Sequence, residues 1–204
     1  DFEHSNNSHT KLNSEQQALV DKLISNQGLR ELYQKYGLCR DCQQPNTYNF
    51  DKSSWCQSCN AQHFAQDFDK WTSGNLGIDK LIRKCQLEAI NNEQVLEWIP
   101  YEQFKDIEYL AEGGFGKVYK AKWIDGYIKN WISEEKQWKK ESSDFHGKKE
   151  KEGNKNVVLK VLGNSQNTTT EFLQEVANYK LFGGTNLEYI IKCFGISQDP
   201  QTKN

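Results

Sequence analysis

The sequence of 204 residues contains no methionine, only three prolines and no uninterrupted apolar stretch of the roughly 20 residues that span a bilayer. Residues 1–7 also lack the basic and then apolar pattern of a secretory signal peptide. These absences argue against a membrane or secreted protein, and we expect an intracellular, cytoplasmic one. The missing methionine is typical of a processed, trimmed or fragmentary chain.

The chain has no strong excess of charge of either sign, because its formal net charge is −2. Such a balance gives no general attraction to phosphate backbones or anionic lipid, so neither nucleic acid nor a membrane is expected as a partner. What the sequence does contain is 36% hydrophobic residues, with aromatic residues at 12% of the chain. This content is enough for packed cores in one large or two small domains.

Four of the six cysteines form two closely spaced pairs, whereas Cys85 and Cys193 stand alone. The pairs have the pattern C-x2-C-x13-C-x2-C and consist of Cys39, Cys42, Cys56 and Cys59. In a reducing compartment this spacing is typical of a zinc ribbon, because each pair turns two thiolates toward one ion. Disulfides, a redox pair and His63 as a substitute ligand remain alternatives. Four thiolates leave no open coordination position, so we expect a structural zinc that stabilises a module of about residues 36–65.

The rest of residues 1–100 has mostly helical spacing of its apolar positions. This spacing predicts helices over 14–27, ended by Gly28, and over 29–36, ended by Gly37. The clearest periodicity predicts a helix over 76–91, with Cys85 on its buried stripe. A further apolar segment, 95–99, ends at Pro100, where a helix cannot readily continue. We place a domain boundary there.

After Phe104 the apolar pattern changes to alternation, which predicts two strands joined by a glycine turn. Residues 124–156 interrupt this pattern with an added hairpin at 127–138 and a charged, solvated linker at 139–156. A buried strand at 157–162, a helix at 170–182 and a strand at 189–196 follow. The expected fold class is therefore α+β, with a helical, zinc-binding region at 1–100 and a sheet-containing region at 101–204.

Three motifs in residues 101–204 resemble, in the same order, parts of the amino-terminal lobe of a protein kinase. The first is the glycine loop that covers the phosphates of ATP. It comprises Leu110, Ala111, Glu112, Gly113, Gly114, Phe115, Gly116, Lys117 and Val118. Gly113 and Gly116 match the second and third glycines of the family, whereas Ala111 stands at the first. The resemblance implies that Phe115 closes over the phosphates and that Val118 contacts the adenine face.

The second and third motifs resemble the ion pair of the same family. Val157-Val158-Leu159-Lys160 resembles the strand motif whose lysine binds the nucleotide phosphates. Glu175 resembles the helical glutamate that pairs with this lysine, whereas Glu171 is better explained as a helix cap. The resemblance therefore implies catalytic roles for Lys160 and Glu175. The alternative for Lys160 is an ordinary lysine on an exposed strand edge.

The resemblance implies a lobe of one antiparallel sheet and one helix that binds ATP, with Mg²⁺ held through the absent carboxy-terminal lobe. After Lys160 the sequence has neither a His-Arg-Asp nor an Asp-Phe-Gly motif, so this segment is expected to be inactive alone. The whole protein would phosphorylate Ser/Thr or Tyr of an unidentified protein substrate. With the cysteine module in front of the lobe, the chain resembles tyrosine-kinase-like proteins expanded in certain fungi.

Two other functions fit the same residues. The lobe of residues 101–204 can belong to a pseudokinase or scaffold, for which Ala111 in the glycine loop is one argument. Residues 1–100 can instead act as a zinc-dependent interaction module for an unidentified protein partner. The order of the three motifs favours the kinase interpretation over both.

Overall fold

The computed structural model describes residues 14–50, 53–113, 116–141, 155–161, 172–177 and 192–204. The helices are α1 (Ser14–Leu23), α2 (Gln27–Tyr36), α3 (Gln57–Gln66) and α4 (Leu76–Glu88), with two 3-10 turns, η1 (Asn92–Gln94) and η2 (Tyr101–Gln103). The strands are β1 (Tyr48–Phe50), β2 (Ser53–Trp55), β3 (Glu97–Trp98), β4 (Phe104–Gly113), β5 (Gly116–Trp123), β6 (Tyr127–Ile132), β7 (Gln137–Glu141), β8 (Lys155–Val161) and β9 (Gly195–Ile196). Residues 172–177 are also helical. This mixture of helices and small sheets confirms the predicted α+β class.

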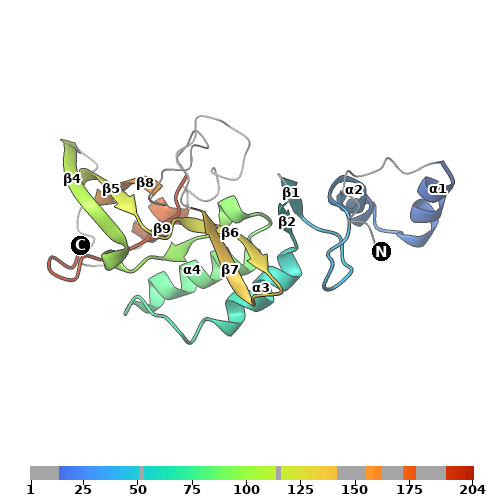
Figure 1. The fold of residues 1–204 in the computed structure, drawn as a ribbon, viewed down its shortest axis with the longest axis horizontal. Coiled ribbons are helices and arrows are strands. Elements are labelled where there is room, and N and C mark those ends of the chain that lie inside the picture. The colour runs from blue at the N-terminus through green and yellow to red at the C-terminus, as the bar shows by residue number, and fades with distance from the viewer. Residues whose placement is uncertain (1–13, 51–52, 114–115, 142–154, 162–171, 178–191) are drawn as a thin grey trace.

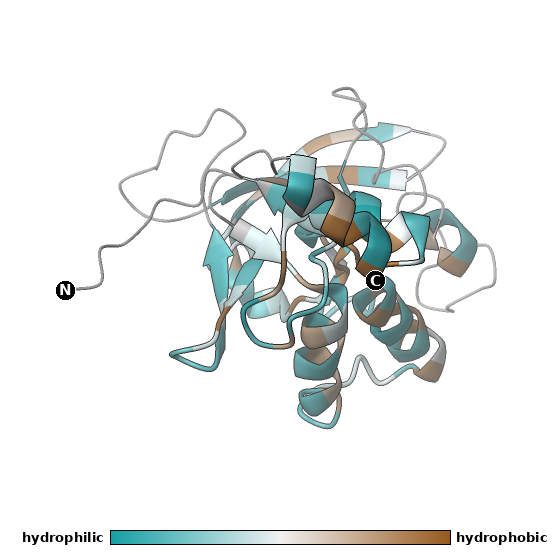
Figure 2. Ribbon diagram, turned by 90° about the vertical axis from the view of Figure 1, so that its right-hand side faces the viewer, coloured by the Kyte–Doolittle hydropathy of each residue, from teal (hydrophilic) through white to brown (hydrophobic). Residues whose placement is uncertain are grey.

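The elements are arranged along one long axis (Figure 1). Helices α1 and α2 lie at one end, and strands β4, β5 and β8 lie at the other. Between them lie α3, α4 and the β6–β7 hairpin. Figure 2 shows that hydrophobic and hydrophilic stretches alternate along the helices, as expected for helices that pack on one side only.

The first two helices differ from the predicted bounds for reasons that lie in their caps. Helix α1 ends at Leu23, before the predicted end at residue 27, and Gly28 lies inside α2 instead of ending α1. The side chain of Asn26 accepts a hydrogen bond from the backbone N–H of Leu29, which fixes the start of α2. Helix α2 ends as predicted at Gly37, whose φ of 70° suits glycine.

Helix α3 was not predicted, whereas α4 was. Asn75 caps α4 by accepting from the backbone N–H groups of Gly77 and Ile78, and the helix ends at Glu88, three residues before the predicted end. Asp79, which is 3% exposed, accepts bonds from the Thr72 hydroxyl at 2.6 Å and the Ser73 hydroxyl at 2.5 Å. Burial opposes ionisation of Asp79, but these hydrogen bonds outweigh it and lower its pKa. The loop before α4 is therefore anchored to the helix.

Strands β4, β5 and β8 form one antiparallel sheet in that order, as the alternating pattern predicted for its first two strands. One face of this sheet contributes Ala121 and Trp123, each 1% exposed, to a core that also includes Ile99 and Phe104. The predicted hairpin is present as β6 and β7. However, β7 continues to Glu141 and β8 begins at Lys155, so the predicted linker at 139–156 is wrong at its start and at its end. Residues 142–154 lie outside the described ranges.

Two further cores join segments from both sides of residue 100. Trp55 and Phe64 pack with Ile128 in one of them, and Ile82 and Leu96 pack with Val176 and Ile196 in the other. The segment 95–99 contains the short strand β3, which pairs in parallel with β9, and is not the end of a helix. The lone cysteines Cys85 and Cys193 are partly buried against the second core.

The helix predicted at 170–182 and the strand predicted at 189–196 lie only partly within the described residues. Of the helix predicted at 170–182, residues 172–177 are described and helical. Of the strand predicted at 189–196, only Gly195–Ile196 is a strand among the described residues. No helix in the described ranges is long and apolar enough to cross a membrane. The division into two domains at residue 100 stays a prediction.

Candidate functional site

The four paired cysteines come from two neighbouring structural elements. Cys39 and Cys42 lie in a tight turn, in which the N–H of Cys39 donates to the Gln44 carbonyl at 2.8 Å. Gln43 completes this turn with a φ of 60°. Cys56 immediately precedes α3, and Cys59 lies in the first turn of that helix. Strands β1 and β2 connect the turn to the helix and bring the two pairs together.

The four sulfur atoms lie within 4.8 Å of one another. The Sγ atoms of Cys39 and Cys59 are 3.8 Å apart, and those of Cys42 and Cys56 are 3.5 Å apart. A tetrahedral zinc with bonds of about 2.3 Å requires sulfur separations of about 3.8 Å. A disulfide would need about 2.05 Å, and all six cysteines are free. The geometry of this cysteine cluster is therefore that of a metal site.

The surroundings of the cysteine cluster do not favour four thiolates without a cation. Burial raises the pKa of Cys56 to about 11 and also raises the pKa of Cys59. Burial opposes ionisation of Cys42 too, but the backbone N–H of Gln44 and the neighbouring thiols lower its pKa. A bound divalent cation offsets such costs, because the sulfurs then coordinate it as thiolates. The donor set fits a structural metal ion.

His63 is not part of the cysteine cluster, contrary to the alternative that it substitutes as a ligand. Its ring stacks on Trp131 of β6, with ring centroids 3.9 Å apart and an angle of 11° between the planes. Burial lowers the pKa of His63, although the carboxylates of Asp41 and Asp67 oppose this. Helix α3 thus uses its first turn for the cysteine cluster and its later residues to contact the β6–β7 hairpin.

The second predicted site lies on the exposed face of the β4–β5–β8 sheet. The Lys160 ammonium on β8 forms an ion pair with the Glu175 carboxylate at 2.6 Å. Val118 is directly opposite Lys160 in the neighbouring strand, and Ala111 is directly opposite Val118. Residues opposite one another in an antiparallel sheet share a face. Ala111, Val118 and Lys160 therefore form a row across three strands.

The glycine loop is described on both sides of its tip. Residues 110–113 end β4 and are exposed, and Gly113 pairs with Gly116 at the start of β5. Lys117 and Val118 continue β5. Gly114 and Phe115 lie outside the described ranges, as does Glu171, the competing partner of Lys160. Nothing in the structure therefore tests the predicted closure of Phe115 over phosphates.

A half-buried ion pair that the sequence analysis missed joins the hairpin to β3. Glu97 is 7% exposed, and its carboxylate accepts from the backbone N–H of Ile128 at 3.0 Å and from Lys140 at 2.8 Å. The Lys140 ammonium also lies 5.6 Å from the centre of the Trp123 ring. No local motif marks Glu97, because its partners are more than 30 positions away in the chain. Its role here is to hold the hairpin against β3.

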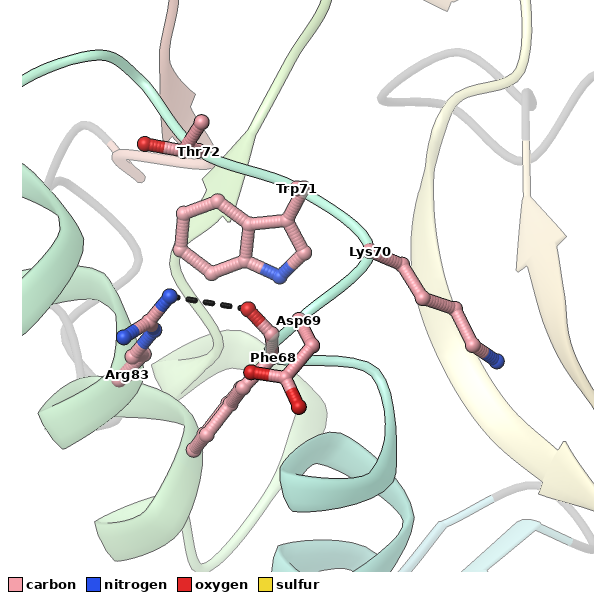
Figure 3. A pocket seen from close by; sticks show the side chains of 6 residues that line it. All are labelled: Phe68, Asp69, Lys70, Trp71, Thr72 and Arg83. Carbon is pink, nitrogen blue, oxygen red and sulfur yellow. Dashed lines mark hydrogen bonds between the residues drawn. The ribbon is translucent and has the colours of Figure 1, made fainter.

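Two hollows lie near α4. The larger, of about 380 Å³, is lined by Phe68, Asp69, Lys70, Trp71, Thr72 and Arg83 (Figure 3). Arg83 donates to the Phe68 carbonyl at 2.9 Å, and its guanidinium lies 5.4 Å from each of the Phe68 and Trp71 ring centres. These contacts attach the loop after α3 to α4. The smaller hollow, of about 200 Å³, lies beneath the β6–β7 hairpin and includes Gln86.

Comparison of the chain with models of protein families, with curated proteins and with solved structures gave no match. The geometry of the two sites therefore carries the functional argument.

Proposed function

We propose that residues 101–204 bind ATP as the amino-terminal lobe of a protein kinase. The observation that carries the proposal is the ion pair between Lys160 and Glu175, at 2.6 Å. In the kinase interpretation this lysine binds nucleotide phosphates while the helical glutamate holds it in place. The alternative, an ordinary lysine on an exposed strand edge, predicts no particular partner, whereas the kinase interpretation predicts this glutamate.

The row of Ala111, Val118 and Lys160 across the sheet adds a second argument, which concerns the base of the nucleotide and not its phosphates. Val118 lies opposite Lys160, so a ligand whose phosphates meet the Lys160 ammonium has its base within reach of the Val118 side chain. Ala111 and the glycines at the end of the β4–β5 hairpin lie on the same part of the sheet. This arrangement suits a flat base with a phosphate chain, because an apolar surface and a cation lie next to each other.

Phosphoryl transfer requires more than this lobe. It needs Mg²⁺ ligands and a base that positions the hydroxyl of the protein substrate. Residues after Lys160 contain neither a His-Arg-Asp nor an Asp-Phe-Gly motif, and we therefore assign nucleotide binding alone to residues 101–204. The proposal for the cysteine cluster is a structural zinc ion, because four thiolates leave no coordination position for a substrate.

Thermal denaturation of the purified chain with and without Mg-ATP tests the proposal. At a hundredfold excess of ATP over its Kd, binding stabilises the folded state by about 2.7 kcal/mol. For a chain of this size we expect the Tm to rise by about 5–10 °C. Lys160→Met should abolish the shift. Lys105→Met should keep it, because Lys105 is exposed at the opposite end of β4 from the glycine turn.

Two results would overturn the proposal. One is a wild-type Tm that does not change at millimolar Mg-ATP. The other is an equal shift in wild type and in Lys160→Met, which would place the nucleotide elsewhere. The metal content of every sample is measured alongside, so that loss of zinc is not mistaken for loss of nucleotide binding.

A further inference from the structure

The ion pair between Lys160 and Glu175 joins two segments that belong to different hydrophobic cores. Lys160 lies on β8, whose Leu159 packs on the core beneath the β4–β5–β8 sheet. Glu175 lies in the helical residues 172–177, which we call the Glu175 segment, and Val176 of this segment belongs to the second core. The distance between the two charged groups therefore depends on how each core holds its own segment.

The Glu175 segment packs against α4 with one of its faces. Val176 is 5% exposed and shares the second core with Ile78 of α4. Phe172 and Leu173 pack against the same core. At 3.6 residues per turn these three apolar residues share one side of a helix, and Glu175 projects from a neighbouring side. The packing of the apolar face thus sets the direction in which Glu175 points.

Gly77, in the first turn of α4, leaves room for this packing. A Cβ atom at Gly77 would lie 3.3 Å from Cδ1 of Leu173, which is closer than ordinary van der Waals contact. The absence of a side chain therefore lets Leu173 approach the backbone of α4. The Asn75 side chain fixes the same turn by accepting from the N–H groups of Gly77 and Ile78. The start of α4 is thus a fixed support for the Glu175 segment.

The packing against α4 is stronger than the ion pair that it positions. The side chains of Lys160 and Glu175 are 28% and 37% exposed. Ion pairs at such exposure contribute little to stability, because water screens them and both side chains must be ordered. Burial of an apolar side chain as complete as that of Val176 contributes several times more. The contact with α4 therefore determines where Glu175 lies, and the ion pair follows from it.

We propose that Ile78 of α4 and Leu173 are positioning residues for the nucleotide site, because they hold Glu175 where it meets Lys160. Helix α4 belongs to residues 1–100, so that region controls a site built by residues 101–204. A change in the position of α4 then changes nucleotide affinity without touching the nucleotide. The inference rests on the proposed function for this consequence, whereas the positioning itself can be measured without ATP.

The first experiment measures the ion pair in the absence of nucleotide. The zinc-loaded chain is labelled with a trace of an amine-acylating ester, and mass spectrometry compares the labelling rate of Lys160 with that of exposed Lys105. A lysine held by a carboxylate reacts slowly, because only an unpaired and uncharged amine attacks the ester. Ile78→Ala should raise the relative rate of Lys160 about two- to fivefold, as expected for loss of a partly exposed ion pair.

The matched control is Ile128→Ala, the same change in the first core. Ile128 is 6% exposed and Ile78 is 9% exposed, so the two variants should lose similar stability. Ile128→Ala should leave the rate of Lys160 unchanged. Glu175→Gln should raise it by the same factor as Ile78→Ala, and the double variant should show no further rise. Ile78→Val, which keeps most of the packing, should retain the slow rate.

Leu173→Ala tests the same contact from its other side. Leu173 is only partly buried, so this variant should fold even if Ile78→Ala does not, and thermal melts establish which variants are folded. Three results would overturn the inference. They are an unchanged rate of Lys160 in the folded variants of Ile78 and Leu173, an equal rise in Ile128→Ala, and a further rise when Ile78→Ala is added to Glu175→Gln.

The second experiment titrates Mg-ATP into the same variants and separates this inference from the proposed function. Ile78→Ala should weaken ATP binding by about the factor by which it raises the labelling rate, and Ile128→Ala should not. If ATP binds equally to wild type and to Ile78→Ala, the inference fails and the proposed function stands. If wild type binds no ATP, the proposed function fails, and the labelling still decides whether α4 positions Glu175.

Discussion

Replacing Cys59 by serine should weaken the whole contact between α3 and the β6–β7 hairpin, not only the metal site. Cys59 lies in the first turn of α3, and one turn later the same helix places His63 on Trp131 and Phe64 on Trp138. Phe64 is 3% exposed. If the first turn loses its metal, the aromatic contacts of the following turn lose the element that positions them.

The loss of stability expected for Cys59→Ser is set by the free energy that zinc binding contributes to folding. Structural zinc contributes about 10–16 kcal/mol to the folding of small zinc peptides, and loss of even a third of this is about 3–5 kcal/mol. A typical domain has a total stability of only about 5–15 kcal/mol. For a chain of this size the corresponding decrease in Tm is about 6–20 °C.

Calorimetry and near-UV circular dichroism of the tryptophans measure the two parts of this prediction, and elemental analysis measures the zinc content. The matched control is Cys85→Ser, the same change at a partly buried cysteine outside the cysteine cluster. It should retain zinc and lower the Tm by about 2–4 °C, as an average core substitution does. The reasoning is refuted if Cys59→Ser stays within about 2 °C of wild type, or if Cys85→Ser lowers the Tm equally.

Two further substitutions test the packing, each by urea denaturation at pH 7. Asp79→Asn should lower the free energy of unfolding by about 1.5–3 kcal/mol, because charge-assisted bonds to buried Asp79 are lost, whereas exposed Asp69→Asn should have little effect. Because the folded-state pKa of Asp79 is lowered, its contribution is present above its usual pKa of 3.8 and lost as the pH falls below it. Gly195→Ala should cost about 1–3 kcal/mol, since the new Cβ meets the Glu97 carbonyl oxygen. Gly113→Ala, with nothing within 4 Å of a new Cβ, should change stability by less than about 0.5 kcal/mol. An equal loss in either control variant would contradict these assignments.

The features predictable from the sequence are those whose cause is local. The cysteine spacing predicts the metal cluster, because each two-residue gap turns two thiols toward one point, and strands β1 and β2 bring the two pairs together. Alternation of apolar residues gives the β4–β5 hairpin, and the added hairpin at 127–138 is present as β6 and β7; in both, the strands are neighbours in the chain. Gly37 ends α2 because its positive φ needs only its own residue type.

The missed features depend on partners far along the chain. Helix α3 has Phe64 as its one large apolar residue, so periodicity gives no signal, and the helix is held by the cysteine cluster and the hairpin rings instead. Strand β3 is two residues long, and its partner strand among the described residues is β9. The burial of Glu97 and Gln86 likewise results from tertiary packing, which overrides the polar character of both residues.

The pairing of β3 with β9 also determines how the chain behaves while it is being made. Glu97 and Gly195 are 98 positions apart (195 minus 97), and the core beneath them buries Ile82 and Leu96 completely, at 0% exposed. At about 5–20 residues per second, a ribosome needs about 5–20 s to extend the chain from one strand to the other. Throughout that interval Ile82 and Leu96 lack the cover that Ile196 gives them in the folded chain, so the nascent chain exposes apolar surface that folding later buries.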